Sequence, residues 1–317
     1  MTSQRLTFKA QMTQVSVPST CANLGPGFDT FAIALDMHDR FAAQVLDDPI
    51  FDVDVTGEGA DEVKRDKNHL VIKSMLRGFE FMGQKPRGIA LRALNVTPHG
   101  RGLGSSASAI VGGLLLARDL VLGGDQYMSN DEMLMLATEL EGHPDNVAAA
   151  IHGGATISWM QDIFPTKDIP NNNAVKIGSS ISIPVHPSIR AVIYIPNQQL
   201  STTKARKLLP ETIPHHDAVL NSSRSALLGV AISTKPELLF TATEDFLHQR
   251  YRASAYPKSM ELVQSLRSHG IAAVISGAGP TVLVLHNGDD QDVARLLEMA
   301  PDGFQAQSLA ISRGGAA

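Results

Sequence analysis

The chain has 317 residues, which exceeds the usual size of a single hydrophobic core and predicts two domains. Its hydrophobic fraction of 43% and charged fraction of 19% are ordinary for a soluble globular protein. The net charge of −5 argues against nucleic-acid binding and against binding to an anionic membrane. With one cysteine, Cys21, no run of about 18 apolar residues and no signal-like N-terminal stretch, the sequence predicts a cytoplasmic protein without disulfides.

Residues 15–96 predict strands, turns and one helix. A turn-rich insert, PSTCANLGPG at residues 18–27, precedes a strand at 28–35 that is apolar on both faces. Alternation predicts a half-exposed strand at 51–55, and helical spacing follows over 68–82. Strand alternation returns at 88–96.

The stretch PHGRGLGSSASAIVGGLLL at residues 98–116 predicts a glycine-rich loop followed by a buried helix. Ser105 or Ser106 is expected to cap that helix. Its buried face is expected to consist of Ala107, Ile110, Val111, Leu114 and Leu115. Glycines and a helix N-terminus favour an anion site for phosphate, whereas the alternative is a Gly/Ser turn that only caps a core helix. No Lys follows Gly104, so the loop is not the common P-loop.

The next elements complete the first domain. A helix is expected from an N-cap at Asp131 to Gly142, followed by a short small-residue helix that ends at Gly153-Gly154. A strand at 155–160 comes next, and residues 161–180 are rich in Pro, Asn and Ser. We therefore predict domains at residues 1–160 and 161–317.

The second domain is predicted to mix strands and helices without strict βαβ alternation. Strands are expected at 189–195, 271–275, 281–285 and 305–311. Helices are expected at 203–209, 216–232, 236–249, 257–268 and 291–299. The predicted fold class of both halves is α+β.

Four polar clusters exceed what a plain core requires. They are residues 23–29; residues 139–146 with Glu139, Glu141, His143, Asp145 and Asn146; the basic residues of 202–207 with Arg250 and Arg252; and SGAGP at 276–280. An acidic residue near a phosphate loop is the expected partner of Mg²⁺, and arginine forks suit carboxylate or phosphate. The alternatives are local turn capping, solvated helix ends, solvated basic residues and a simple hairpin turn.

Together these clusters resemble the GHMP family of small-molecule kinases. Three ordered motifs carry the resemblance: VPSTCANLGPGFDTFAIALD at 17–36, PHGRGLGSSASA at 98–109 and SGAGPTVLVL at 276–285. Within the family, the segments at 22–29, 143–148 and 201–210, with Tyr251-Arg252, are most similar to the members that phosphorylate L-homoserine. The first motif lacks the K-x-x-L-x-G-E-H pattern of mevalonate kinase, which counts against mevalonate and sugar substrates.

The resemblance implies a fold, a reaction and partners. The fold would be an N-terminal domain like domain 2 of ribosomal protein S5, followed by a ferredoxin-like α/β sandwich. The reaction would transfer the γ-phosphoryl group of ATP to the side-chain hydroxyl of L-homoserine, within threonine biosynthesis. ATP and Mg²⁺ are the implied cofactors, and a homodimer is the base-rate expectation for assembly.

The resemblance also implies roles for individual residues. The expected ATP-binding residues are Pro98, Gly100, Arg101, Gly102, Leu103, Gly104, Ser105, Ser106, Ala107, Ser108, Gly277 and Gly279, with Asn68 on the adenine side. Ser106 and Glu139 are the expected metal ligands, with Glu141 as the rival. The substrate ammonium would be bound by Asn23, Asp29 and His143, and its carboxylate by Thr202, Arg206 and Arg252. The catalytic residues would be Asn146, which would orient the attacking hydroxyl, and its neighbour Asp145. A general base is not obvious, and phosphoryl transfer depends mainly on alignment and charge.

Other functions are weighed against this one. A GHMP kinase acting on another alcohol and a non-catalytic sensor that kept the pocket are the alternatives, and Ser106 with Glu139 favours activity. An S5-like nucleic-acid binder is disfavoured by the acidic balance.

Overall fold

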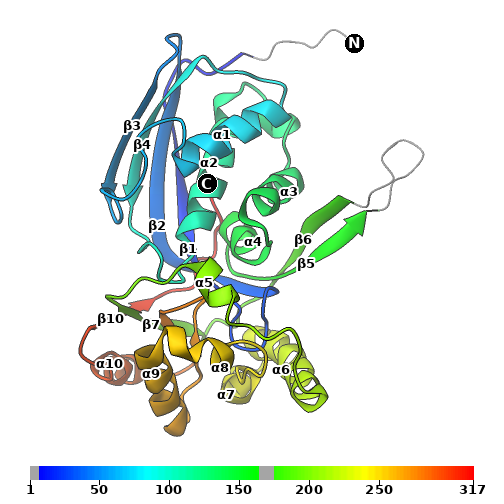
Figure 1. Cartoon of the computed structure of the whole chain (residues 1–317), viewed down its shortest axis with the longest axis vertical. Helices are drawn as coiled ribbons and strands as arrows, with labels where there is room; N and C mark the ends of the chain where they lie inside the picture. Colours follow the sequence, from blue (N-terminus) through cyan, green and yellow to red (C-terminus); the bar gives the residue numbers. More distant parts are fainter. Residues whose placement is uncertain (1–6, 164–174) are drawn as a thin grey trace.

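The protein consists of two lobes stacked along its long axis (Figure 1). A computed structural model describes residues 7–163 and 175–317. Each lobe combines one β-sheet with helices, so the predicted α+β class is confirmed. In the described part of the chain, no helix is both long and apolar enough to span a membrane.

The sheet of the upper lobe is organised around the long strand β2. Its strands are β1 (Thr13–Ala22), β2 (Phe31–Leu46), β3 (Phe51–Gly57), β4 (Gly88–Asn95), β5 (Ala155–Ile163) and β6 (Val175–Ile183). They run in the order β3-β4-β2-β5-β6, and β1 also pairs with β2. The first residues of β2 pair with β5 and its last residues pair with β4. The β3–β4 pair is parallel, and the other pairs are antiparallel.

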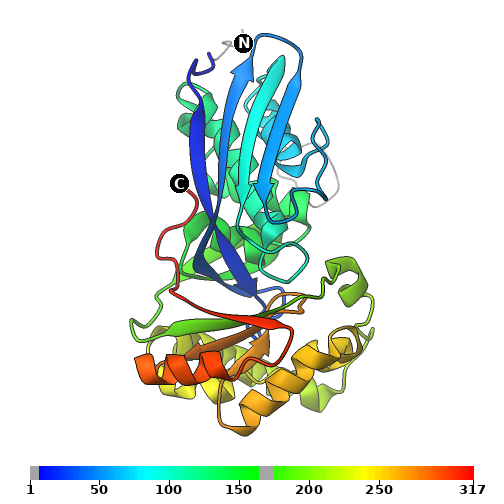
Figure 2. The same ribbon diagram turned by 90° about the vertical axis from the view of Figure 1, so that its left-hand side faces the viewer.

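Four helices pack behind this sheet, as Figure 2 shows with the strands in front. They are α1 (Leu70–Phe81), α2 (Ser105–Leu120), α3 (Asn130–Glu141) and α4 (Asp145–His152). The predicted buried face of α2 is confirmed, since each of its five apolar residues is at most 3% exposed. Gly112 allows α2 to approach β2, because a Cβ there would lie 2.5 Å from the Phe41 ring.

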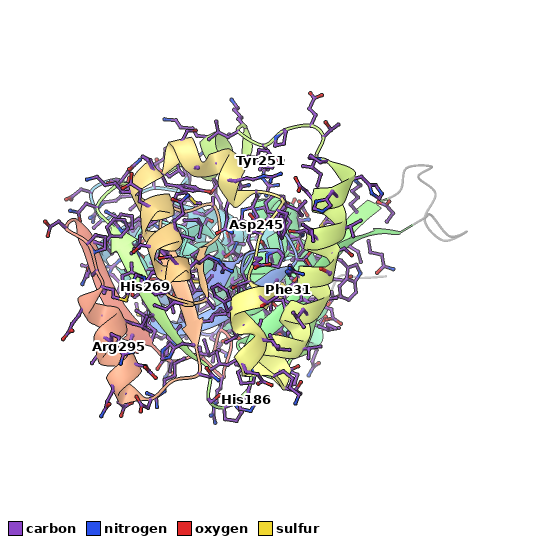
Figure 3. All side chains as sticks on the ribbon, turned by 90° about the horizontal axis from the view of Figure 1, so that it is seen from below. Phe31, His186, Asp245, Tyr251, His269 and Arg295 are labelled. Carbon is purple, nitrogen blue, oxygen red and sulfur yellow. The ribbon has the colours of Figure 1, made fainter. Side chains whose placement is uncertain are left out.

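The sheet of the lower lobe has the order β10-β7-β9-β8 and is antiparallel. Its strands are β7 (Arg190–Pro196), β8 (Ala273–Ile275), β9 (Val282–His286) and β10 (Phe304–Leu309). The helices are α5 (Thr202–Arg206), α6 (His215–Ser233), α7 (Leu239–Ala242), α8 (Gln249–Arg252), α9 (Pro257–Ser268) and α10 (Asp290–Glu298). Seen from below, α6, α9 and α10 cover the sheet (Figure 3). Short 3₁₀ turns lie at Gly124–Gln126, Pro236–Leu238 and Ala253–Ala255.

The connection between β1 and β2, residues 23–30, joins the two lobes. The Pro26 carbonyl accepts hydrogen bonds from Asn221 Nδ2 at 2.8 Å and from Ser225 Oγ at 2.6 Å, both on α6. The Gly25 carbonyl lies 2.8 Å from His248 Nε2. Phe31, at the start of β2, lies against α6 (Figure 3). The connection itself is therefore fixed relative to the lower lobe.

Several local expectations differ from the structure. Neither Ser105 nor Ser106 caps α2, because Gly104 occupies the N-cap with φ 73° and no side-chain cap bond is formed. The N-cap of α3 is Ser129 rather than Asp131, since Ser129 and Glu132 form a reciprocal capping box. The helix expected at 236–249 is broken because the Asp245 carboxylate accepts bonds from the next backbone N–H groups and starts the separate helix α8.

The division into domains at residues 160 and 161 stays a prediction. β6 pairs with β5 and extends the first sheet to Ile183, and the second sheet begins with β7 at Arg190. The change of sheet therefore lies later in the chain than the predicted boundary. Residues 164–174 of the expected linker lie outside the described residues.

Candidate active site

A cavity of about 80 Å³ lies where the glycine loop, the β1–β2 connection, the N-terminal end of α4 and the lower lobe meet. All the predicted substrate-binding and catalytic residues line it, namely Asn23, Asp29, His143, Asp145, Asn146, Thr202, Arg206 and Arg252. These residues are far apart in the sequence. The fold thus brings the polar clusters of the sequence together at one site.

The β1–β2 connection holds Asn23 and Asp29 in unusual backbone conformations. Asn23 has φ 70° and Asp29 has φ 53°, both in the left-handed region of backbone conformation that residues other than glycine rarely adopt. Asn23 Oδ1 accepts a 2.9 Å bond from the Asp29 backbone N–H, and its Nδ2 donates to the Gly277 carbonyl at 2.7 Å. Such strain is typical of functional sites, where surrounding contacts stabilise it.

Asp29 and Arg206 form a bidentate ion pair at the cavity. Nη1 and Nη2 of Arg206 donate to the two carboxylate oxygens at 2.8 and 2.9 Å. The hydrogen bond with Asp29 raises the pKa of Arg206, although partial burial opposes it. The pair presents a carboxylate and a guanidinium side by side, as recognition of a zwitterion requires.

Arg252 is a buried cation that forms no salt bridge with any of the described residues. Its side chain is 2% exposed, and in the described part of the chain its Nε and Nη1 have no hydrogen-bond partner. Burial lowers the pKa of Arg252. Because an unpaired buried charge is costly, these donors indicate an anionic ligand in the cavity. Arg250, the other arginine of this segment, is instead ion-paired with the Asp217 carboxylate.

Three polar residues at the N-terminal end of α4, His143, Asp145 and Asn146, also line the cavity. His143 Nδ1 lies 2.6 Å from Asp145 Oδ1, which also accepts the Asn146 backbone N–H at 2.8 Å. Burial opposes protonation of His143, but Asp145 and other nearby carboxylates outweigh it and raise its pKa. The Thr20 hydroxyl donates to Asn146 Oδ1 at 2.7 Å, and Asn146 Nδ2 donates to Asp145 Oδ1 at 3.4 Å, which leaves the second N–H of that amide for a ligand.

The glycine loop forms the wall between this cavity and a second one. Gly100, Gly102 and Gly104 all have positive φ, between 64° and 78°. Ser276 Oγ donates to the Gly102 carbonyl at 2.6 Å, and a Cβ on Gly102 would overlap the Ser276 carbonyl. The 276–280 turn therefore supports the loop from behind, and Gly277 itself lines the cavity.

The second cavity, of about 390 Å³, lies beyond the loop and shares Gly100, Ser105 and Ser106 with the first. Asn68 lines it, where the adenine side was expected. Its volume falls in the usual range for small-molecule sites. One loop thus separates a large cavity from a small, highly charged one.

The acidic partner of Ser106 is Glu141 rather than Glu139. The Ser106 hydroxyl donates to Glu141 Oε1 at 2.7 Å, and Glu141 lines the cavity. Glu139 is instead held by Arg77, with Nη2 2.9 Å from Oε2. Residues two apart on a helix do not share a face, so only one of the two carboxylates of α3 can reach the loop. Burial raises the pKa of Glu141. The oxygen donors of Ser106 and Glu141 fit Mg²⁺.

The remaining predicted ATP-binding residues do not line either cavity with their side chains. The Arg101 guanidinium donates to the carbonyls of Pro196, Asn197 and His99, and so fixes the loop to the end of β7. Gly279 packs against Tyr256. Four further residues are buried beneath the loop: Pro98, Leu103, Ala107 and Ser108.

Some lining residues were not among the predicted ones. Phe28, Leu200 and Ala278 line the small cavity, and Thr20 lies behind it. Phe28, Ala278 and Thr20 belong to the motifs at 17–36 and 276–285, so their place in those motifs could have identified them as site residues. Leu200 directly precedes the 201–210 segment.

Comparisons with known proteins bear on the family and the fold of the chain. The family described as GHMP kinases N terminal domain matches residues 69–154, and GHMP kinases C terminal matches residues 231–303. Homoserine kinase of Streptomyces avermitilis is 44% identical over 98% of this chain and 96% of its own length. Homoserine kinase of Mycobacterium tuberculosis is 41% identical over 98% of this chain and 96% of its own length. The crystal structure of homoserine kinase from Cytophaga hutchinsonii has a TM-score of 0.82 at 23% identity, over 99% of both chains.

Proposed function

The chain belongs to the GHMP kinase family, and on that premise we propose that it transfers the γ-phosphoryl group of ATP to the side-chain hydroxyl of L-homoserine. The product, O-phospho-L-homoserine, is an intermediate of threonine biosynthesis. The phosphate loop accounts for the donor, and the charged cavity beside it accounts for an amino-acid acceptor.

The observation that carries the proposal is the buried, unpaired guanidinium of Arg252. A carboxylate bound there would supply the missing acceptors for Nε and Nη1. Arg206 and Thr202 line the same cavity and would complete the carboxylate site. An uncharged alcohol such as a sugar would leave the buried cation unpaired, so the cavity favours an alcohol that carries a carboxylate.

The ammonium group of the substrate is assigned to the carboxylate of Asp29, with Asn23 and His143 beside it. Asp29 remains paired with Arg206, so the pair offers one charge to each end of the substrate. Asn23 fixes Asp29 through the bond to its backbone N–H.

We assign Asn146 to orienting the attacking hydroxyl. Asp145, beside it, carries the negative charge that balances His143. Thr20 holds the Asn146 oxygen and Asp145 accepts one amide N–H, so the second N–H of Asn146 can donate to the hydroxyl oxygen. Asp145 holds His143 and the first turn of α4 in place. Alignment of this kind is what a loose phosphoryl-transfer transition state requires, and a strong general base is not needed.

ATP is assigned to the glycine loop, with its nucleoside in the cavity that Asn68 lines. Backbone N–H groups of residues 102–106 would donate to the phosphates at the N-terminus of α2. Ser106 and Glu141 would hold Mg²⁺, which neutralises charge on the phosphates when bound.

An assay of ADP release with L-homoserine, mevalonate and galactose in parallel tests the proposal. We expect turnover with L-homoserine and none above background with the other two. Turnover with mevalonate but not with L-homoserine would overturn the substrate assignment. Tight binding of L-homoserine without turnover would indicate a sensor instead of an enzyme.

A further inference from the structure

Phe28 lies at the point where both arginines of the cavity converge. The Arg252 Cζ atom lies over the Phe28 ring at 5.0 Å from its centroid, and the Arg206 Cζ atom at 5.5 Å. Both distances fall within the range of cation–π attraction. The residue belongs to the β1–β2 connection of the upper lobe, whereas both arginines belong to the lower lobe.

The two arginines differ in their ion pairs. Arg206 has the bidentate carboxylate of Asp29. Arg252 has no ion pair among the described residues, and the nearby charge of Arg206 adds to the burial that lowers its pKa. The Asp29 and Asp245 carboxylates attract the Arg252 cation from a distance without a salt bridge to it, and the negative face of the Phe28 ring lies directly against its guanidinium.

His248 supports Phe28 without adding charge. Its ring stacks on Phe28 with a centroid distance of 5.0 Å and an interplanar angle of 25°. It is fully buried, and burial lowers its pKa against the opposing charge of Asp245, which favours the neutral imidazole. The carbonyl of Gly25 lies 2.8 Å from Nε2 and can only accept, which assigns the proton to that nitrogen. A neutral imidazole stacked in this way fixes the Phe28 ring and does not repel the guanidinium groups.

We propose that Phe28 is a positioning residue whose ring holds the Arg252 guanidinium ready for the substrate carboxylate. The ring partly stabilises the buried cation in the empty site and limits the orientations of its planar fork. Binding of the carboxylate then loses less free energy to the ordering of the Arg252 side chain, because its donors are already in place. This inference rests on the proposed function, because it concerns recognition of the homoserine carboxylate.

The test compares Phe28→Met with Phe28→Tyr in steady-state kinetics. Met fills a similar volume without a ring quadrupole, whereas Tyr keeps the aromatic face. We expect Phe28→Met to raise the KM for L-homoserine about tenfold, with kcat and the KM for ATP changed less than about twofold. Phe28→Tyr should restore the wild-type KM within about twofold. If Phe28→Met does not fold, Phe28→Leu takes its place with the same expected result.

Phe240→Met is the matched control. It removes a ring that lies under Arg267 at 4.6 Å, outside the cavity, by the same substitution. We expect it to leave the KM for L-homoserine unchanged. In an Arg252→Gln background, Phe28→Met should raise the KM for L-homoserine by less than about twofold, because the ring acts through Arg252.

Three results would overturn the inference. The KM for L-homoserine could be unchanged in Phe28→Met, the KM values for ATP and L-homoserine could rise equally in that variant, or Phe28→Tyr could raise the KM for L-homoserine as much as Phe28→Met does. Wild-type enzyme measured in the same assay separates the two claims. Failure of wild type to phosphorylate L-homoserine would contradict the proposed function, whereas an active wild type with an insensitive Phe28→Met would contradict this inference alone.

Discussion

At the scale of single residues, the structure distinguishes neighbours that the sequence presents as equivalent. Glu139 and Glu141 are both acidic, both on α3 and both close to the phosphate loop in the family pattern. Only the helical phase separates them, and Glu141 follows the buried Ala137 and Thr138 by four and three residues, on the same face of α3. Arg250 and Arg252 form a similar case, since one pairs with Asp217 and the other is buried at the cavity.

The pair Glu141→Gln and Glu139→Gln tests the metal assignment. Glu141→Gln is expected to raise the Mg²⁺ concentration needed for half-maximal activity at least about tenfold, because a ligand oxygen loses its charge. Glu139→Gln should change it less than about twofold, since only an exposed bridge to Arg77 is lost. Titration of activity with Mg²⁺ measures both, and the opposite order would return the assignment to Glu139.

His143 gives a prediction with a definite sign. Its pKa is raised in the folded protein, because the interaction with Asp145 outweighs burial. Its stabilising contribution is therefore fully present below the unfolded pKa of about 6.5 and is lost as pH rises through the folded pKa. Urea unfolding at several pH values should show that the difference in unfolding free energy between wild type and His143→Asn falls as pH rises.

His152 provides the control of opposite sign. Burial lowers the pKa of His152, so protonation destabilises the fold there. The difference in unfolding free energy between wild type and His152→Asn should therefore grow as pH rises from the lowered folded pKa to the unfolded pKa of about 6.5, and stay constant above it, where the His143 difference falls. If the difference in unfolding free energy between wild type and His143→Asn also grew with pH, that result would contradict the assignment of the His143–Asp145 pair.

At the scale of elements, strongly periodic segments were predictable and capping details were not. The buried face of α2 follows from apolar spacing, and all of its predicted residues are buried. The N-cap of α2 does not follow, because Gly104 takes the left-handed conformation and Ser106 turns to Glu141. β6 escapes prediction because small polar residues dilute the alternation of Ile177, Ile181 and Ile183. One reason for small residues is packing, since Gly178 lies against Thr138 of α3.

Gly104→Ala, compared with Gly123→Ala, tests the geometry of the phosphate loop. Both glycines have φ 73°. A Cβ on Gly104 would overlap Thr20 Oγ1, whereas a Cβ on Gly123 would have its nearest neighbour at 3.9 Å. Both variants should lose about 1–2 kcal/mol of stability from backbone strain, measured by urea unfolding.

Activity should separate these two variants. Gly104→Ala is expected to lower kcat about a hundredfold, since it displaces the Thr20–Asn146 pair beside the reacting hydroxyl. Gly123→Ala should keep kcat within about twofold. Equal kcat values for the two variants would mean that the loop geometry does not set the alignment.

At the scale of the whole molecule, the site exists because one connection of the upper lobe is inserted into the lower one. The motif order suggested which clusters share a site, but their contacts depend on long-range packing that no local pattern contains. The bonds of Pro26 with Asn221 and Ser225 are examples, since they join residues about two hundred positions apart. The same insertion places Phe28 beneath Arg252, and a sequence motif alone does not reveal that contact.

The central claim is that one cavity recognises both charged groups of an amino acid beside the ATP phosphates. The most direct measurement is kcat/KM for L-homoserine, for 3-aminopropan-1-ol, which lacks the carboxylate, and for 4-hydroxybutanoate, which lacks the ammonium. We predict that each truncated alcohol is about a thousandfold poorer, because 3-aminopropan-1-ol offers no carboxylate to the buried Arg252 and 4-hydroxybutanoate offers no ammonium group to Asp29. Turnover of 3-aminopropan-1-ol within about tenfold of L-homoserine would contradict the account.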